Sequence, residues 1–195
     1  MKTLFTLLFL YGFLPAKSQN DIHWSADYQL QLSDFRSSAT HIGTSTVYTI
    51  STAAGFEFSF FMTNAEFLFT RHFNDKVNCV FNRNGSYIIA NDTAVALGLL
   101  NFAQFQFDLA ELYARKFRQR LYEEKSTFSG VGFLEHAYET IQVEYNERLG
   151  TVGRISDIGQ KPEKLREYHL EVLAEIETLP DFCKTCKPPR KKKTK

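Results

Sequence analysis

The residues of this 195-residue chain that could carry chemistry are led by five histidines and three cysteines. No two histidines share a helix face at the spacing of metal ligands, and the sequence has no H-E-x-x-H, Gly-rich phosphate loop or nucleophile elbow. His136, with Glu135 beside it and Glu139 one turn later, could bind a metal, but an exposed polar helix face explains these residues equally well. Taken alone, the residues give no chemical signature.

Two of the three cysteines form a Cys-x-x-Cys pair, Cys183 and Cys186, close to the C-terminus. Thioredoxin-like chemistry needs such a pair at a helix N-terminus after a strand, and a zinc site needs two further ligands. Neither context is visible in the sequence. We therefore expect either a small local disulfide loop or two free thiols at a frayed chain end.

The formal net charge of +1 conceals a strong segregation of charge. Without the two lysines of residues 1–18 and the seven basic residues of 184–195, 14 basic residues face 22 acidic ones, so the body carries about −8. Such a body excludes a generally basic nucleic-acid binder, and we expect no specific nucleic-acid partner. The basic tail, residues 182–195, is predicted to be disordered and is a candidate for contact with anionic surfaces.

The N-terminus has the pattern of a secretory signal peptide. Lys2 precedes an apolar run over residues 4–14, and the small-x-small triplet 16–18 predicts cleavage after Ser18. The run is shorter than the roughly 20 residues that span a bilayer, and no other stretch is long and apolar enough to do so. We expect an exported, periplasmic or extracellular protein with a leader over 1–18 and a single domain over 19–181.

Hydrophobic periodicity predicts strands followed by helices. Alternation with a period of two runs from Ile42 to Ile89 and predicts half-buried strands joined as antiparallel hairpins. The predicted strands cover residues 56–63, 66–70 and 76–81, with turn signals at 54–55, 64–65, 74–75 and 84–85. This order defines an α+β class with a mostly antiparallel N-terminal sheet.

Three helices are predicted after the strands. The first begins at the cap signal 91–93 and ends near Glu124, the second runs from 132 to 149 with Gly150 as its stop, and the third begins at Pro162. We expect the basic residues near the end of the first helix to lie on a solvated surface: Arg115, Lys116, Arg118 and Arg120. Glu111 has basic neighbours, which favours ion pairing over acid–base catalysis.

The segment 108–118, DLAELYARKFR, resembles the signature helix of a bacterial family of secreted zinc-dependent proteases, catalogued as domain-of-unknown-function family 922. In that family the motif H-E-x-x-H immediately precedes this stretch. Other pieces follow the family's order, including Trp24-Ser25, the segment 81–87, Tyr145-Asn146 and a turn at 156–159. The resemblance covers about residues 22–178 and implies a zincin-like fold.

The chain departs from this family at the metal site. Phe102 and Gln106 replace the two helical histidines, Ala103 replaces the general-base glutamate, and the turn alignment puts Ile158 in place of a further histidine. Phe has no lone pair, Ala has no titratable group, and the amide of Gln is a poor zinc ligand. The resemblance therefore implies a catalytically inactive relative without a cofactor, whose metal site has been refilled as core.

Two classes of function stay open. In the first, the inactive protein is either a structural protein or a binding protein. As a binding protein it takes an unknown protein or peptide in a cleft at Phe102, Gln106 and Glu111, or by strand addition to a sheet edge. The alternative is an active zinc metallopeptidase with replacement ligands, namely His136 or His169 together with carboxylates such as Asp108 and Glu111.

Overall fold

The computed structural model describes residues 20–58, 63–125 and 131–188. The predicted leader, residues 59–62 of the predicted strand 56–63, and the last seven residues of the basic tail lie outside these ranges. In the described part of the chain, no helix is long and apolar enough to cross a bilayer.

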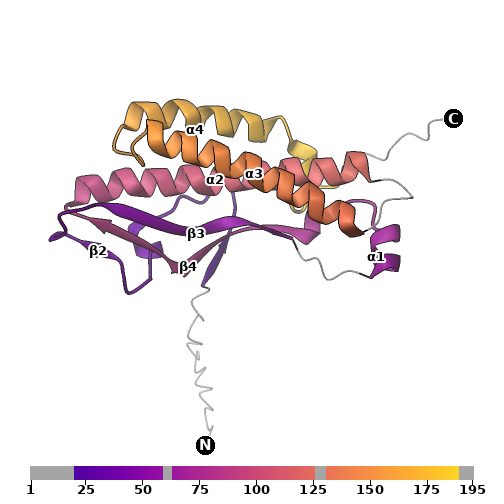
Figure 1. The fold of residues 1–195 in the computed structure, drawn as a ribbon, viewed down its shortest axis with the longest axis horizontal. Coiled ribbons are helices and arrows are strands. Elements are labelled where there is room, and N and C mark those ends of the chain that lie inside the picture. The colour runs from indigo at the N-terminus through magenta and orange to yellow at the C-terminus, as the bar shows by residue number, and fades with distance from the viewer. Residues whose placement is uncertain (1–19, 59–62, 126–130, 189–195) are drawn as a thin grey trace, which may run out of the picture.

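A four-stranded mixed sheet forms one layer of the molecule (Figure 1). The central strand β4 (Val77–Ala90) pairs antiparallel with β1 (Asp21–His23) and with β3 (Thr49–Phe58), and it pairs parallel with the short β2 (His41–Ile42). Side chains alternate across the sheet, so that one face buries its residues under the helices and the other is open. The predicted mostly antiparallel sheet is confirmed.

The predicted short hairpin between β3 and β4 is wrong, because their connection contains the helix α1 (Asn64–Phe69). The hydroxyl of Thr63 caps this helix by accepting a hydrogen bond from the Glu66 N–H. Phe67 is buried against Phe73, whereas Phe69 is 79% exposed. The alternation read as a strand at 66–70 therefore belongs to a short helix that buries one of its two phenylalanines.

Three predicted turns are also wrong, because residues 54–55 lie inside β3, residues 84–85 lie inside β4 and residues 64–65 begin α1. The backbone at Gly55 is not in the left-handed conformation that glycine often adopts in turns. At Gly85 the N–H donates to the side chain of Asn82, and the chain continues as a strand. Both strands therefore continue through their glycines without a turn.

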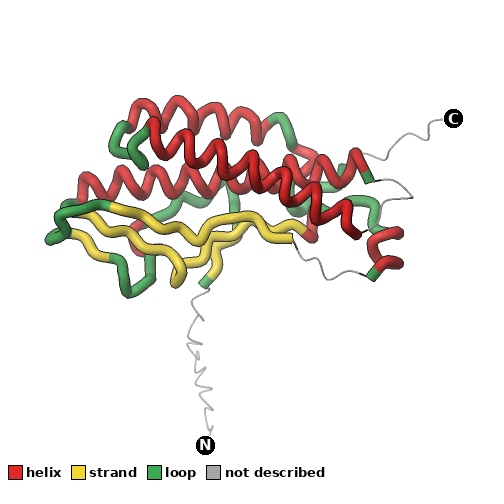
Figure 2. The backbone as a smooth tube through the Cα atoms, in the orientation of Figure 1, coloured by secondary structure: helices red, strands yellow, loops and turns green. Residues whose placement is uncertain are grey.

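Three long helices lie on the same side of the sheet (Figure 2). They are α2 (Thr93–Glu124), α3 (Val131–Ile155) and α4 (Pro162–Glu177). The Asp92 carboxylate caps α2 by accepting from the Val95 N–H, and Pro162 opens α4, both as predicted. The predicted stop at Gly150 is wrong, because α3 continues through it for five further residues to Ile155.

Helix α2 is the centre of the molecule. It packs against β3 and β4 on one side and against α3 and α4 on the other. From Phe102 to Arg115 every residue except Gln106 is buried, which is the pattern of a helix enclosed on all sides. Strands followed by helices around this one core confirm the α+β class.

Candidate functional site

The positions matched to the family's metal site begin on α2, where Phe102 is 6% exposed and Ala103 is fully buried. The Phe102 ring stacks on Phe105 with 6.0 Å between the ring centroids. Its Cζ atom lies 3.2 Å from the point where a Cβ on Gly153 would stand, and the Cγ2 atom of Ile158 lies 3.8 Å from that same point. The structure therefore brings Phe102 and Ile158 together, although they come from different elements.

Ile158 lies in a strained turn between α3 and α4. Asp157, Ile158 and Gly159 have φ values of 52°, 43° and 97°, all in the left-handed region. A β-branched residue is an outlier there, and holding such a conformation costs about 1–3 kcal/mol. The turn is retained by backbone hydrogen bonds, including that from the Ile158 N–H to the Gly153 carbonyl at 2.7 Å.

The same turn is pressed against α2 through two glycines. A Cβ added to Gly159 would stand 2.8 Å from the carbonyl carbon of Gly98, closer still to the carbonyl oxygen, and 3.2 Å from the Cβ of Phe102. A Cβ added to Gly98 would stand 3.0 Å from the Gly159 oxygen. Only residues without side chains permit this approach, which fixes the turn beside Phe102.

Gln106 lies one helical turn after Phe102 and faces β3. Its Oε1 atom accepts a hydrogen bond from the Thr52 hydroxyl, which satisfies part of the polar group on an otherwise apolar stripe. The Tyr145 hydroxyl is also close. Burial dominates at that phenol and raises the pKa of Tyr145 to about 12, although a weak interaction with Gln106 opposes the rise. The contact does not meet full hydrogen-bond geometry, since the Tyr145 oxygen has no such partner within the described residues.

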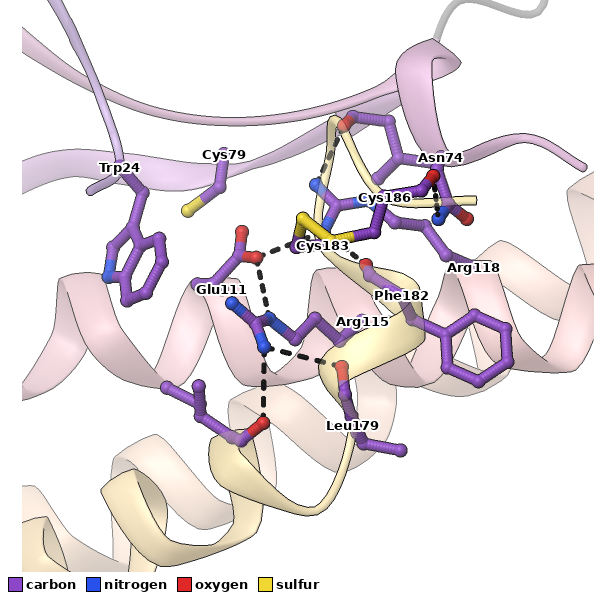
Figure 3. A network of polar contacts seen from close by, with 12 residues as sticks. Trp24, Asn74, Cys79, Glu111, Arg115, Arg118, Leu179, Phe182, Cys183 and Cys186 are labelled. Atoms are coloured by element: carbon purple, nitrogen blue, oxygen red, sulfur yellow. Dashed lines mark hydrogen bonds and ion pairs between the residues drawn. A yellow bond between two sulfur atoms is a disulfide. The ribbon is translucent and has the colours of Figure 1, made fainter. Parts of the chain in front are cut away.

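Glu111 does not line a cleft. Its side chain is 3% exposed and accepts hydrogen bonds from Arg115 Nε at 2.9 Å and from Arg118 Nη1 at 3.0 Å (Figure 3). The predicted ion pairing of Glu111 is confirmed. The predicted solvated surface is wrong for both arginines, since Arg118 is completely buried and Arg115 nearly so. The residues expected to form one cleft, Phe102, Gln106 and Glu111, instead have separate partners in the core.

The two buried arginines bind the C-terminal segment. Arg115 donates to the carbonyls of Ile176 and Leu179 at 3.1 and 3.2 Å, and Arg118 donates to the carbonyl of Phe182 at 2.9 Å (Figure 3). The Ile176 and Leu179 carbonyls also accept backbone N–H groups, and a carbonyl with two lone pairs can accept from the guanidinium groups as well. Their burial is thus compensated by a carboxylate and by backbone acceptors, as buried charges require.

The segment after Phe182 is docked rather than frayed, as far as Cys186. Cys183 and Cys186 form a disulfide, so of the two states expected for the pair the local loop is the one found. Asn74 Nδ2 donates to the carbonyls of Asp181 and Cys186, both at 2.9 Å. The third cysteine, Cys79, is buried in β4 with a free thiol, and this burial raises its pKa well above the usual value.

A second buried carboxylate, Asp108, connects α2 to two distant segments. It accepts hydrogen bonds from Trp24 Nε1 at 2.7 Å, from His169 Nε2 at 2.7 Å and from Gln104 Nε2 at 3.1 Å. Gln104 in turn accepts from the Leu30 N–H at 2.8 Å. Sequence reasoning placed Asp108 and His169 only as alternative zinc ligands and missed this network. A carboxylate on a buried helix needs hydrogen-bond donors. This requirement is the signal in the sequence from which the Asp108 network could be expected.

The donor atoms present do not fit a zinc ion. Phe102, Ala103 and Ile158 offer no ligand atom, and within the described ranges no group of three or more His, Cys, Asp or Glu side chains is placed to hold a metal. His136 is exposed on α3, while Glu111 is held by two arginines. Of the replacement ligands of the metallopeptidase alternative, His169 and Asp108 are in contact with each other, but within the described ranges no third ligand joins them.

Comparisons of this chain with protein-family models, with curated proteins and with solved structures find no match. The class that fold and site define is an α+β protein whose central helix is enclosed by packing and by buried polar networks. Any narrower assignment depends on the geometry of the chain itself.

Proposed function

We propose that this protein is an exported, catalytically inactive relative of the secreted zinc-dependent proteases whose signature helix it resembles. In this proposal the metal site has been refilled as core, and the protein serves as a binding or structural protein. The observation that carries the proposal is the contact region shared by Phe102 and Ile158 beside Gly153.

This observation supports the proposal because the alignment with the family uses the sequence alone and contains no information on which residues meet in space. It assigns Phe102 and Gln106 to ligand positions on a helix and Ile158 to a ligand position on a distant turn. An incorrect alignment gives no reason for the helix and the turn to meet. In the structure Ile158 lies beside Phe102, and Gln106 follows Phe102 by one helical turn.

The backbone at Ile158 gives further support. Its φ of 43° lies in the left-handed region, where histidine is enriched several-fold and β-branched residues are outliers. Ile158 therefore occupies a conformation that suits histidine better. Such a turn is the expected remnant of a ligand position whose side chain has changed while its backbone has not.

Export is the second part of the proposal. The leader pattern at 1–18 supports it. The disulfide between Cys183 and Cys186 is a second support, because disulfides form and persist outside the reducing cytosol. Fractionation of the producing cell, with detection of the cleaved chain, measures it directly. Full-length chain retained in the cytosol would contradict export.

Restoring the site tests the refilled metal centre. We expect the variant Phe102→His, Ala103→Glu, Gln106→His, Ile158→His to bind one zinc ion per chain, measured by metal analysis and by calorimetry. The matched control Leu97→His with Asn101→His places two histidines at the same spacing on the exposed face of α2 and should bind zinc at least tenfold more weakly. The smaller variant Phe102→His with Ile158→His tests the pair if the fourfold change disturbs folding.

Two results would contradict the proposal. A restored variant that is folded by circular dichroism but binds zinc no better than the control would show that the alignment is wrong. Stoichiometric zinc and peptide hydrolysis by the unaltered protein, lost on Glu111→Gln or His136→Ala, would establish the metallopeptidase alternative.

A further inference from the structure

The open face of the sheet contains a depression of about 430 Å³. Its lining residues come from three strands: Asp21, His23, Ala53, Ala54, Gly55, Glu57, Asn78, Val80 and Asn82. The neighbouring residues Ile22, Phe56 and Phe81 are buried on the helix side, so strand alternation places most of the lining on the face away from the helices. The depression therefore lies on the opposite side of the sheet from Phe102.

Strand register defines the shape of this depression. Gly55 pairs with Val80, and Ala53 pairs with Asn82, so small and apolar side chains form its floor. Glu57 pairs with Asn78 at one end. At the other end, Asp21 of β1 pairs with Asn82 of β4, so that β4 lies between Asp21 and β3. The middle of the floor, at Gly55 and Val80, is thus small and apolar, and each end carries one carboxylate.

Nothing in the fold requires a glycine at position 55. Its φ is not left-handed, a Cβ added there would meet no atom within 4 Å, and the irregularity of β3 lies between Ser51 and Ala53. A glycine inside a strand weakens it and marks a bulge, a bend or the close approach of a ligand. With no bulge at this residue, the space above Gly55 is open to a ligand.

The polar groups around this floor are available for a ligand. Among the residues that the structure describes, the side chains of His23, Glu57 and Asn78 have no hydrogen-bond or ion-pair partner. Asp21 accepts one hydrogen bond, from Asn82 Nδ2 to its Oδ1 at 2.7 Å, which leaves its Oδ2 free. No lysine or arginine lines the depression, so its charge favours a cation.

The separation of the two carboxylates determines the kind of cation. Glu57 and Asp21 stand four residues apart along β4 and two strands apart across the sheet, which puts their Cα atoms roughly 16 Å apart at ordinary strand spacings. A single ammonium group reaches only one of them. A chain with an ammonium at each end reaches both, and its methylene groups lie over Gly55 and Val80.

We propose that this depression binds a linear polyamine, with one terminal ammonium at Glu57 and the other at Asp21. The site is independent of the inactive-protease proposal, because it shares no residue with the region around Phe102. Charge complementarity with the acidic body adds to the local attraction.

Calorimetric titration of the full chain with spermine tests this proposal. The decisive variant is Gly55→Val, which fills the floor, changes no charge and suits a strand. We expect it to bind spermine at least tenfold more weakly with an unchanged or higher melting temperature. Glu57→Gln and Asp21→Asn should each weaken binding several-fold, whereas the control Glu163→Gln, on the exposed start of α4, should change it less than twofold.

The ligand series distinguishes the chemistry. We expect n-butylamine, with one ammonium group, to bind at least tenfold more weakly than spermine. Equal binding of spermine by Gly55→Val would overturn the proposal, since the attraction would then be that of an acidic surface in general. Binding of a neutral disaccharide or of a lysine-containing peptide in preference to spermine would overturn it as well.

Discussion

Replacing Gly159, in the turn between α3 and α4, with alanine should destabilise the protein more than replacing Gly98 or Gly150. Its φ of +97° is unfavourable for every residue with a Cβ, which costs about 1–3 kcal/mol. The added Cβ would also stand 2.8 Å from the carbonyl carbon of Gly98 and 3.2 Å from the Cβ of Phe102. Such overpacking costs about 1–3 kcal/mol more. The free energy of unfolding should therefore fall by about 2–6 kcal/mol.

Two other glycines provide matched controls for this change. At Gly98 the closest atom to an added Cβ is Nε2 of the flexible Gln160, at 2.7 Å, and the helix favours alanine. Gly98→Ala should therefore cost less than Gly159→Ala. Gly150 lies within α3 with no atom within 4 Å of its added Cβ, so Gly150→Ala should stabilise the protein by about 0.5–1 kcal/mol.

Urea denaturation followed by circular dichroism measures all three free energies of unfolding. The expected order of stability is Gly150→Ala, then the unaltered protein, then Gly98→Ala, then Gly159→Ala. If Gly159→Ala lies within about 1 kcal/mol of the unaltered protein, where strain and overpacking predict more, the turn is not pressed against α2. The meeting of Phe102 and Ile158, on which the proposed function depends, would then fail with it.

Further predictions concern the core and two titratable groups. Phe102→Ala should lower the free energy of unfolding by about 3–5 kcal/mol, because it empties the refilled site. Burial alone would raise the pKa of Glu175, but hydrogen bonds from Lys116 and Arg148 outweigh it and lower the pKa. The stabilisation by Glu175 is therefore present above its unfolded pKa and is lost as the pH falls through the folded value, so Glu175→Gln should flatten the acid limb of a melting-temperature profile. Cys79 should react with iodoacetamide only after unfolding, as mass spectrometry can show, because the buried thiol has a raised pKa.

Helix α2 could be predicted from sequence because its signals are local. Asp92 caps its first turn, no proline interrupts it, and its apolar spacing repeats over 32 residues. Helix α1 has only six residues, and two phenylalanines two positions apart fit a strand as well as a helix. The sequence predicts a helix stop at Gly150, but a glycine typically ends a helix where the backbone turns left-handed, and the backbone at Gly150 stays helical.

In the candidate site, too, the contacts set by local spacing could be predicted from the sequence and those set by distant segments could not. The pairing of Glu111 with arginines follows from helix spacing for Arg115, which is four residues away. The burial of Arg118 does not, because it depends on the carbonyls of Val77 and Phe182, which come from distant segments. Local patterns assign charged residues at a helix end to solvent, and only the folded chain reveals the acceptors that bury them.

The burial of α2 limits where this protein can bind anything. Its two buried carboxylates, Asp108 and Glu111, accept hydrogen bonds from side chains of the core, so neither is exposed to a substrate or metal. On the outer face of the sheet, by contrast, Glu57 and His23 lie exposed around a glycine that the fold does not need. Polar groups without partners are free to recognise a ligand, whereas saturated ones hold the fold together. If the helix layer has lost a metal site, the sheet face is where binding should be sought.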